Sequence, residues 1–505
     1  MPDTLNIIPL PQSVKMGEGF FNCKGIPPVK GDGIFSREID VFRQQLEACG
    51  IPAWIPAGQG AETGIVCRKV ETLKDEAYRL KIAREKIILE ASSGAGMYHG
   101  LQSLRQLFLS GGEGGGKTEG GFALPCADVE DYPRFPWRGL MLDCSRNFYS
   151  KNFVKKIIDA ISLHHLSIFH WHLTDDQGWR FPVDAYPLLT EIGSKRYDKR
   201  RWRYTGGFYT KDDIREVVAY AAARHVEVVP EVDFPGHASS ILAPYPGLGC
   251  TGGPYGVEDR FGIFEDVLCA GNDAIFDLIE KVFDTLAELF PSKWVHIGGD
   301  EVLYNRWNEC PKCRKRMEET GLKNSRELQS WITVKLVQML GERGKTAIGW
   351  DEILEDTPAY KLPPQAAVMS WRGRKGGAEA AERGHSVVMS PNTDGCYLDY
   401  QPVNDPDEPG QLGTSGIKQL YNMNAVDAGM SAEEASRIIG GQANLWTELV
   451  YAARIAEYMI FPRICALAET VWTEKKDFDD FARRLPLHQA RLDKLDLIQY
   501  RGPLA

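Results

Sequence analysis

The chain has 505 residues, of which 43% are hydrophobic and 25% are charged, a composition typical of a globular protein with at least one large core. The formal net charge is −10, and no basic stripe is interleaved with aromatic residues, which argues against a nucleic-acid partner. No window approaches the ~20 consecutive apolar residues of a membrane span. Residues 1–8 lack a basic segment leading into an apolar run, so we expect a cytoplasmic location, or a secreted one if a leader was removed.

The sequence contains eleven cysteines, an odd number scattered along a long chain. This pattern predicts reduced, buried thiols and not a disulfide framework. Cys310-Pro-Lys-Cys313 has the spacing of half a zinc site, but no second pair of cysteine or histidine ligands follows it. We therefore predict a surface turn with two thiols there, and neither a metal nor another cofactor for the protein.

The N-terminal part of the chain, residues 1–135, is predicted to form a small α+β domain. Apolar runs at 64–67 and 86–90 are typical of strands, and an amphipathic pattern over 97–109 predicts a helix. The glycine-rich stretch at 111–121 is followed by no helical pattern, so it predicts a flexible hairpin or linker and not a phosphate-binding loop. We expect no chemistry in this domain.

Residues 136–505 alternate short apolar runs with longer helical patterns, which predicts parallel strands with crossover helices. The runs are 137–142, 166–172, 226–232, 294–297, 346–350, 367–371, 386–389 and 438–445, and the clearest helical patterns are 152–164, 211–223, 272–289 and 326–343. Eight strands predict a (β/α)8 barrel with elaborated loops. An open doubly wound sheet is the alternative, but it usually has fewer strands, and no glycine-rich dinucleotide turn follows the first strand.

Polar and aromatic side chains gather where the predicted strands end, which is where a barrel of this kind carries its active site. They include Asp143, Arg146, His170, His172, Asp175, Asp176, Glu231, Asp233, His237, His296, Asp300, Glu301, Trp350, Asp351, Glu352, Trp371, Tyr397, Asp399, Asn444, Trp446 and Glu448. Such a ring suits either metal-dependent hydrolysis or carbohydrate hydrolysis.

The tryptophans discriminate between these two chemistries. Trp350, Trp371 and Trp446 stand at three different strand ends, which is natural in a pocket for a pyranose ring and unexpected in a metal site. The metal alternative would use His170, His172 and Asp175. We favour hydrogen-bonded core roles for both histidines.

The segment Trp294-Val-His-Ile-Gly-Gly-Asp-Glu301 leads a strand into two glycines and then two carboxylates. Glycines allow a tight backbone turn. Adjacent carboxylates repel, which favours protonation of one of them near neutrality and so suits a general acid. Taken alone, the motif more commonly indicates a hydrogen-bonding acidic turn.

Six segments together resemble the family 20 glycoside hydrolases, the β-N-acetylhexosaminidases. They are Arg138-Gly-Leu-Met-Leu-Asp-Cys-Ser-Arg146, Phe169-His-Trp-His-Leu-Thr-Asp-Asp-Gln177, Pro230-Glu-Val-Asp-Phe-Pro-Gly-His237, His296-Ile-Gly-Gly-Asp-Glu301, Gly349-Trp-Asp-Glu352 and Gln442-Ala-Asn-Leu-Trp-Thr-Glu448. The resemblance covers the whole barrel and, more loosely, the N-terminal domain. It implies an exo-acting retaining enzyme that removes terminal GlcNAc or GalNAc, with the substrate's acetamido group as nucleophile and an oxazolinium intermediate.

The resemblance also assigns roles to the reacting groups. Glu301 would act as general acid and then general base, Asp300 would orient the acetamido N–H and stabilise the developing charge, and Tyr397 would hydrogen-bond the acetamido carbonyl. Asp175 and His237 match a pair that lies behind the acid and tunes its proton affinity.

The remaining predicted contacts hold the sugar. Trp350, Trp371 and Trp446 would enclose the acetamido methyl and the apolar face of the ring. Arg146 would bind the 3- and 4-hydroxyls, Glu448 the 4- and 6-hydroxyls, and Asp399 the 6-hydroxyl. We expect structural roles for Asp176, Asp233, His296 and Glu352, and we expect the loops at 245–263 and 401–412 to shape the aglycone side.

A third alternative is a non-catalytic sugar-binding protein on the same scaffold. The intact pair Asp300 and Glu301, with Tyr397, argues against it because a lectin needs none of them. The partner is therefore expected to be a glycan or glycoconjugate with a terminal β-linked N-acetylhexosamine. The sequence leaves open its epimer, its aglycone and the oligomeric state.

Overall fold

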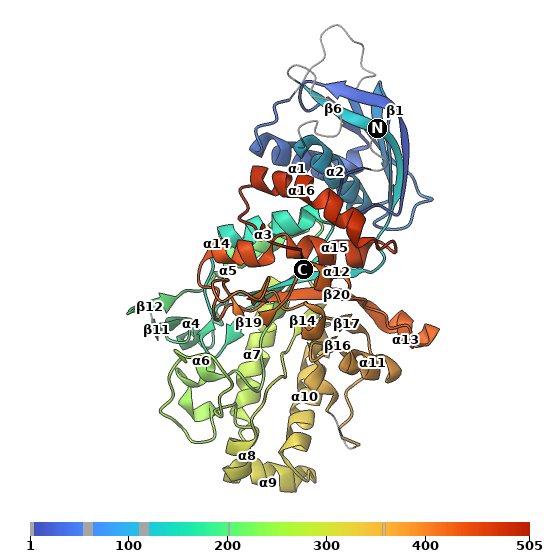
Figure 1. The fold of residues 1–505 in the computed structure, drawn as a ribbon. Coiled ribbons are helices and arrows are strands. Elements are labelled where there is room, and N and C mark those ends of the chain that lie inside the picture. Colours follow the sequence, from blue (N-terminus) through green and yellow to red (C-terminus); the bar gives the residue numbers. More distant parts are fainter. Residues whose placement is uncertain are drawn as a thin grey trace.

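The computed structural model describes residues 5–53, 64–110, 121–199, 202–355, 357–358 and 360–504. An N-terminal α+β domain stands against one side of a closed barrel (Figure 1). The predicted hairpin or linker at 111–121 lies outside the described residues, apart from Gly121.

The N-terminal domain is a six-stranded sheet in the order β1-β6-β4-β5-β3-β2. Its strands are β1 (Ser13–Cys23), β2 (Val29–Gly31), β3 (Gly64–Lys69), β4 (Tyr78–Ile82), β5 (Lys86–Ala91) and β6 (Phe122–Asp131), and its helices are α1 (Ser36–Ala48) and α2 (Gly94–Leu109). Strand β4 alternates buried and exposed residues, as expected for a sheet with one covered face.

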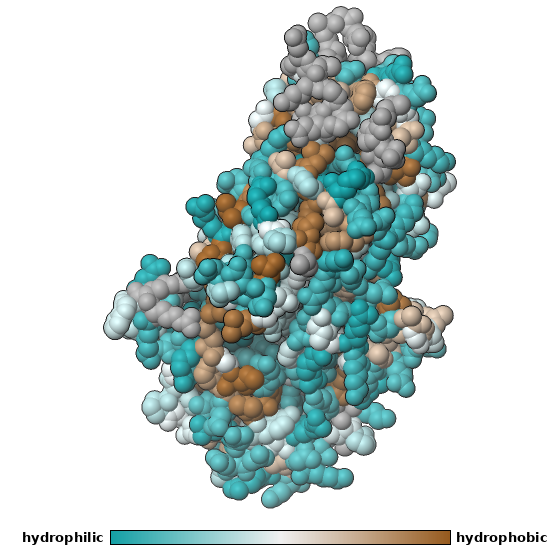
Figure 2. Space-filling model, viewed as in Figure 1, coloured by the Kyte–Doolittle hydropathy of each residue, from teal (hydrophilic) through white to brown (hydrophobic). Residues whose placement is uncertain are grey.

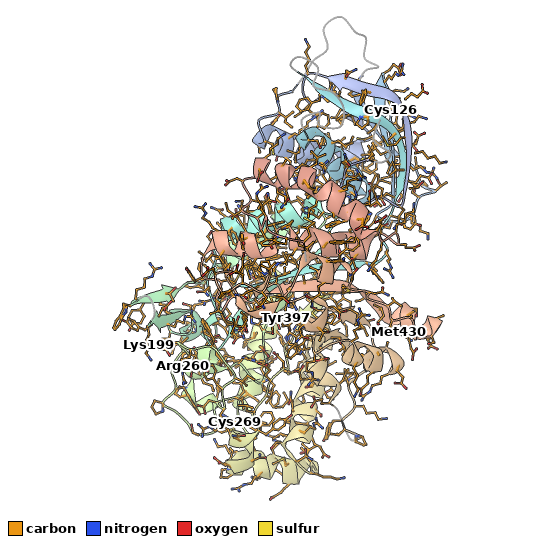
Figure 3. The ribbon with its side chains drawn as sticks, viewed as in Figure 1. Cys126, Lys199, Arg260, Cys269, Tyr397 and Met430 are labelled. Atoms are coloured by element: carbon orange, nitrogen blue, oxygen red, sulfur yellow. The ribbon has the colours of Figure 1, made fainter. Side chains whose placement is uncertain are left out.

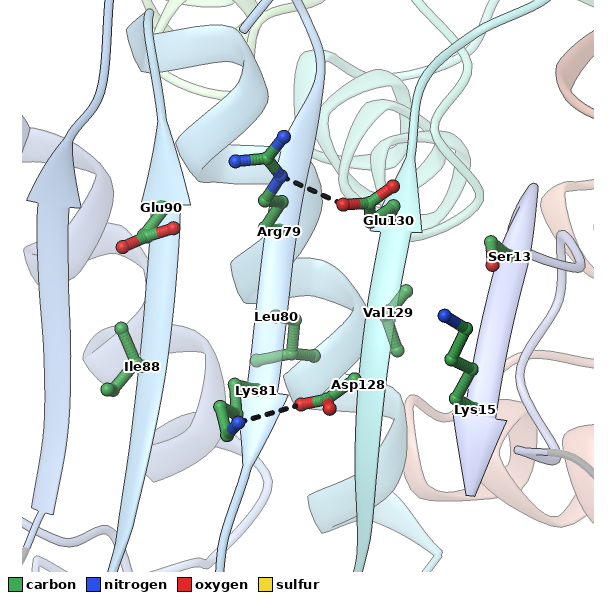
Figure 4. A pocket seen from close by; sticks show the side chains of 10 residues that line it. All are labelled: Ser13, Lys15, Arg79, Leu80, Lys81, Ile88, Glu90, Asp128, Val129 and Glu130. Carbon is green, nitrogen blue, oxygen red and sulfur yellow. Dashed lines mark ion pairs between the residues drawn. The ribbon is translucent and has the colours of Figure 1, made fainter. Parts of the chain in front are cut away.

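The other face of this sheet is polar (Figure 4). Arg79 lies 3.0 Å from Glu130 and Lys81 lies 3.6 Å from Asp128, so cross-strand ion pairs between β4 and β6 line the hollow there. All four side chains are well exposed, so these pairs stabilise the sheet only slightly.

Eight parallel strands close the barrel in chain order, with the last strand pairing with the first. They are β7 (Trp137–Asp143), β8 (Ile168–His172), β13 (Glu227–Glu231), β14 (Trp294–His296), β15 (Thr346–Trp350), β16 (Ala367–Ser370), β17 (Val387–Met389) and β20 (Ile438–Leu445). Each corresponds to one predicted run, so the prediction of a (β/α)8 barrel behind a small α+β domain is confirmed.

The helical patterns also appear as helices around the barrel. They are α3 (Lys151–Leu163), α5 (Lys211–Ala222), α7 (Ala274–Leu289) and α10 (Ser325–Gly341). Further along the chain, the structure adds α11 (Lys375–Glu382), α12 (Ile417–Tyr421), α13 (Ala432–Arg437), α14 (Ala453–Ile460), α15 (Arg463–Trp472) and α16 (Phe478–Lys494). After β15 the crossover is a short 3-10 turn, Asp351–Leu354.

The two domains are joined by helices and by one tryptophan. Helix α2 packs against α3 and α16, which places it between the sheet and the barrel. Trp472, the last residue of α15, is fully buried in the core of the N-terminal domain, and its indole N–H donates to both carboxylate oxygens of Asp131 at 3.0 and 3.1 Å. This shared core fixes the domain against the side of the barrel. The boundary that we predicted between residues 135 and 136 stays a prediction.

The face of the molecule in Figure 2 is mainly hydrophilic, with hydrophobic side chains in separate groups. Among the helices of the described ranges, none combines the length and the apolar character needed to cross a membrane.

Candidate active site

All eleven side chains predicted for the site follow the carboxyl ends of the barrel strands, and every strand contributes at least one. They are Arg146 after β7, Asp175 after β8, His237 after β13, Asp300 and Glu301 after β14, Trp350 at the end of β15, Trp371 after β16, Tyr397 and Asp399 after β17, and Trp446 and Glu448 after β20. Figure 3 labels Tyr397 near the middle of the molecule.

The segment that carries Tyr397 is held by a contact absent from the sequence pattern. Tyr397 forms a parallel bridge with Asn444 of β20, through hydrogen bonds from the Asn444 N–H to the Cys396 carbonyl and from the Leu398 N–H to the Asn444 carbonyl, at 2.7 and 2.8 Å. This pairing brings Tyr397 and the following residues beside the end of β20.

Aromatic rings form one continuous wall of the site. Trp371 stacks on Tyr397 with centroids 5.9 Å apart and planes 11° apart. Tyr397 lies 6.2 Å from Trp446, which in turn lies 5.7 Å from Trp350. Trp350, Tyr397 and Trp446 are buried, while Trp371 is partly exposed. The structure therefore brings the three predicted tryptophans together around the tyrosine.

Beneath this wall, Glu231 is the centre of a buried polar network inside the barrel. Its carboxylate lies 2.5 Å from His172 Nδ1, 3.0 Å from His170 Nε2 and 2.9 Å from His296 Nδ1, and it accepts a 3.0 Å hydrogen bond from the Trp350 indole. Burial opposes ionisation, but the imidazoles, His172 foremost, hold the pKa of Glu231 well below its ordinary value. The network fixes the orientation of Trp350.

The same network accounts for both histidines of the alternative metal site. His172 contacts Glu231 through Nδ1 and Asp175 through Nε2, the latter at 3.0 Å. His170 lies between Glu231 and the Gln442 side chain, whose Nε2 is 2.9 Å from His170 Nδ1. Both ring nitrogens of His172 contact carboxylates, while His170 accepts from Gln442 through Nδ1 and only lies near Glu231 through Nε2. Both histidines are buried among protein groups, in keeping with the predicted core role.

A chain of polar contacts runs from Asp175 through His237 to Glu301. His237 Nδ1 lies 3.2 Å from Asp175 and 3.0 Å from Asp176, and its Nε2 lies 3.6 Å from Glu301 and 3.9 Å from Asp300. Burial disfavours the imidazolium, but Asp175 foremost raises the pKa of His237 well above its ordinary value. Burial likewise opposes ionisation of Asp175, yet Arg146 and then His237 hold its pKa well below normal.

The turn that presents the two acids is tight, as predicted from its two glycines, and it places Glu301 in a strained backbone conformation. Gly298 and Gly299 have φ of +64° and +94°, and a Cβ on Gly298 would stand 1.9 Å from Asp233 Oδ1. Glu301 itself has φ of +53°, and His237 has φ of +46°. Non-glycine residues rarely adopt this region, and such strain tends to cluster at functional sites.

The two adjacent acids differ in environment. The Glu301 side chain is 32% exposed, whereas that of Asp300 is 12% exposed. Burial, followed by the charge of Asp233, raises the pKa of Asp300 well above its ordinary value. Asp300 is therefore the deeper group of the pair, and Glu301 is the one that a departing group can reach.

Glu352, expected to be structural, contacts the site directly. It accepts a 2.9 Å hydrogen bond from the Trp371 indole, so it sets the orientation of the most exposed tryptophan of the wall. Burial, and then the charges of Asp300 and Asp351, raise its pKa to about 9. The only signal in the sequence is its place two residues after Trp350.

A second group of side chains in the site carries acceptors with no protein partner. Asp399 Oδ1 and Glu448 Oε2 are buried and have no hydrogen bond within the part of the chain that the structure describes; the same is true of Asp300 Oδ1. Arg146 lies close by, fixed by Asp175 at 2.7 Å and by Gln177 at 3.2 Å, with its guanidinium 4.9 Å from the centre of the Trp446 ring. Buried acceptors without partners cost free energy unless a ligand supplies donors.

The predicted surface turn at Cys310 and Cys313 is wrong. Both thiols are buried, because Pro311 starts helix α9 (Pro311–Thr320) and the pair packs against Cys269 and Cys250 from the loop after β13. The expectation of free thiols is confirmed, since all eleven cysteines are described and unpaired, and nine are buried.

Comparisons with known proteins match almost the whole chain. The model for the catalytic domain of glycosyl hydrolase family 20 matches residues 135–475, and the model for domain 2 of that family matches residues 4–132. A beta-hexosaminidase of Porphyromonas gingivalis is 37% identical over 99% of this chain, which spans 65% of that protein's length.

Two solved structures extend the likeness to the fold. The exo β-N-acetylglucosaminidase of Vibrio harveyi, in complex with N-acetylglucosamine, gives a TM-score of 0.88 at 30% identity, covering 99% of this chain and 80% of the other. The Flavobacterium johnsoniae chitobiase gives 0.81 at 33% identity, covering 98% and 73%. With both family models matched in order and the barrel's acidic pair in place, the chain belongs to glycoside hydrolase family 20.

Proposed function

We propose that this protein is an exo-acting retaining β-N-acetylhexosaminidase that removes terminal non-reducing GlcNAc or GalNAc by substrate-assisted catalysis. The observation that carries the proposal is a pair of adjacent acids beside an aromatic wall: Glu301, which lies 3.6 Å from His237 at the end of a polar chain, and the deeper carboxylate Asp300. The beta-hexosaminidase relatives and the N-acetylglucosamine bound in the Vibrio harveyi structure support the choice of substrate.

In the first step, the carbonyl oxygen of the 2-acetamido group attacks C1 while the bond from C1 to the leaving oxygen breaks. Glu301 gives its proton to that oxygen, a role that its partial exposure and its 3.6 Å separation from His237 support. The product on the enzyme is the oxazolinium ion. No enzyme carboxylate needs to bond to C1, because the nucleophile belongs to the substrate.

Asp300 and Tyr397 are placed to direct the acetamido group. The unpaired Oδ1 of Asp300 can accept the acetamido N–H. As positive charge develops on that nitrogen it favours the ionised carboxylate, so the contact strengthens towards the transition state. Burial raises the pKa of Tyr397 well above its ordinary value, so its hydroxyl keeps its proton and can donate to the acetamido carbonyl.

In the second step, water attacks C1 and the C1–oxygen bond of the oxazolinium opens. Glu301, now ionised, takes a proton from that water, which restores the acid for the next turnover. Two successive displacements at C1 return the β configuration. Retention therefore follows from the mechanism.

The far end of the sugar would be held by Asp399, Glu448 and Arg146. The unpaired oxygens of the two carboxylates suit the 4- and 6-hydroxyls, while Arg146 retains donors for the 3- and 4-hydroxyls. Contacts to the 3-, 4- and 6-hydroxyls of the same sugar leave no room for a further residue at its non-reducing end, which supports exo action. Either epimer at C4 can be accommodated, because an arginine and a carboxylate both reach that hydroxyl.

The test compares the initial rate of 4-nitrophenol release from its β-GlcNAc glycoside with that from its β-glucoside. Rapid release from the first and none from the second is expected, because only the first carries the nucleophile. Equal rates on both would overturn substrate assistance. Binding of GlcNAc without release from either would identify a sugar-binding relative instead.

A further inference from the structure

Four cysteine side chains converge away from the candidate active site, at the start of α9. The sulfur atoms of Cys250, Cys269, Cys310 and Cys313 all lie within 4.8 Å of one another. Cys269 Sγ is 3.7 Å from Cys310 Sγ and 3.7 Å from Cys313 Sγ, and Cys250 Sγ is 3.8 Å from Cys313 Sγ. Figure 3 labels Cys269 close to α8 (Asn305–Glu309) and α9, apart from Tyr397.

These separations are those of a tetrahedral thiolate site. Zinc binds thiolate at ~2.3 Å, so two sulfurs at corners of a tetrahedron around it stand about 3.8 Å apart. A disulfide would instead hold two sulfurs at ~2.05 Å. Cys269 Sγ is equally distant from the sulfurs of Cys310 and Cys313. The geometry therefore does not single out a disulfide pair and instead suits one centre shared by all the sulfurs.

The backbone around the cluster lets the segments that carry the cysteines approach one another closely. Gly249 and Leu268 form an antiparallel bridge that sets Cys250 beside Cys269. A Cβ on Gly271 would stand 2.2 Å from the Lys312 carbonyl carbon and 2.5 Å from the Cys313 nitrogen, so only glycine lets the two ligand-bearing segments touch.

Local charge suits a thiolate cluster. Four thiolates and one divalent cation carry a net charge of −2. The positive end of the α9 dipole faces the cysteines, because Cys310 is the N-cap of that helix.

We propose that Cys250, Cys269, Cys310 and Cys313 bind one structural Zn²⁺ ion. Each thiol loses its proton to solvent as the metal binds. Four protein ligands fill the coordination sphere, so the ion supports structure and takes no part in the sugar chemistry.

The proposed ion would hold together the two ends of the loop at 251–268. This loop contacts residues of the candidate active site. Glu258 donates its backbone N–H to the Asp176 carbonyl at 3.0 Å, and Gln177 donates to the Arg260 carbonyl at 2.8 Å. Gln177 in turn accepts from Arg146. A metal ion that held Cys250 and Cys269 together would therefore support the residues that position Arg146.

The first experiment measures metal content in the full-length protein purified under reducing conditions, by elemental mass spectrometry. About one zinc per chain is expected, as in other four-cysteine sites. Addition of a mercurial to the protein should release that zinc as it titrates the thiols. Iron in place of zinc, two disulfides found by peptide mapping, or four titratable thiols in a metal-free protein would each overturn the proposal.

Variants locate the site. Cys250→Ser alters the half-buried ligand, which folding tolerates best, and it should lower zinc content at least several-fold and speed proteolysis within 251–268. Cys49→Ser, at the end of α1 in the N-terminal domain, is the matched control and should keep its zinc. Co²⁺ added to the metal-free chain should give the absorption of a tetrahedral thiolate complex. Zinc retained in Cys250→Ser, or a cobalt spectrum without thiolate bands, would contradict the assignment.

Discussion

The two ends of the candidate site differ in how their polar groups are satisfied. Around His237, each ring nitrogen faces a carboxylate of the protein, and Asp175 is held by Arg146 and two histidines. At the other end, Asp399 and Glu448 each leave a buried oxygen without a partner among the described residues. At the first end, protein groups supply the partners of His237 and Asp175, which suits a group that holds and moves a proton. The second end is completed only by a donor from outside, which suits recognition of hydroxyls.

The largest expected effect lies at the proton end. Glu301→Gln removes the acid, so kcat/KM should fall about 10²–10⁴-fold on a GlcNAc disaccharide, whose leaving group needs a proton. The loss should be far smaller on 4-nitrophenyl β-GlcNAc, whose leaving group departs unprotonated. Initial rates on both substrates check this, with Glu47→Gln, an exposed glutamate of α1, as control. Equal losses on the two substrates would remove Glu301 from the acid role.

The next effect concerns the carboxylate between the two ends. Asp300→Asn keeps the shape but removes the charge that stabilises the acetamido nitrogen, so kcat should fall by roughly 10²–10³-fold. KM should change much less, because the positive charge exists only near the transition state. Steady-state kinetics on 4-nitrophenyl β-GlcNAc measure both constants. A loss of only a few-fold would place Asp300 outside the mechanism.

At the hydroxyl end the loss should be moderate and dependent on the substrate. Burial, and then the charge of Glu448, raise the pKa of Asp399 well above its ordinary value, so its contact with a hydroxyl is an ordinary hydrogen bond. Asp399→Asn weakens that bond, which is worth about 0.5–1.5 kcal/mol, so kcat/KM should fall about 2- to 10-fold. A 6-deoxy-GlcNAc glycoside is the matched probe, because it lacks the hydroxyl assigned to Asp399. A loss that persists undiminished on that glycoside would break the assignment.

The sequence predicted the eight strands because parallel strands are buried on both faces and therefore give short runs between helical patterns. The run at 438–445, for example, matches β20. It predicted that the candidate site residues gather at one end of the barrel, because parallel strands all end there; their roles rest on six motifs that resemble a known family and stay predictions. It missed contacts between loops. The bridge of Tyr397 to Asn444 and the bond from Trp371 to Glu352 depend on loop conformations that no periodicity encodes.

The cysteine cluster was missed for a related reason. No second ligand pair follows Cys313 in the sequence, because Cys250 and Cys269 precede it and are separated from each other by a whole loop. Their approach depends on the pairing of Gly249 with Leu268 and on the space left by Gly271. Spacing identifies ligand pairs that lie within one turn; it does not identify ligands that a fold brings together.

The smallest expected effect is one on stability, and it contrasts two neighbouring glutamates. The folded-state pKa of Glu352, about 9, lies above the ordinary value of 4.5. The folded chain therefore holds this proton more tightly than the unfolded chain, and the group lowers stability progressively as pH rises from about 4.5 towards 9. Glu352→Gln removes that penalty and keeps an acceptor for the Trp371 indole. Its Tm should match the parent's near pH 4.5 and exceed it by roughly 2–4 °C at pH 8.

Glu355 is the control with the opposite sign. Burial opposes ionisation, but Arg372 at 2.9 Å and Arg326 at 2.5 Å lower its pKa, so its ionised form stabilises the fold above the ordinary pKa and that contribution is lost as pH falls. Glu355→Gln should therefore lower Tm at pH 8, with a smaller difference at acid pH. Thermal melts of both variants between pH 4.5 and 8 measure the two slopes. If the two variants shifted Tm in the same direction at pH 8, Glu352 would not be a neutral carboxyl supporting Trp371, and the wall would be held by an ionised group instead.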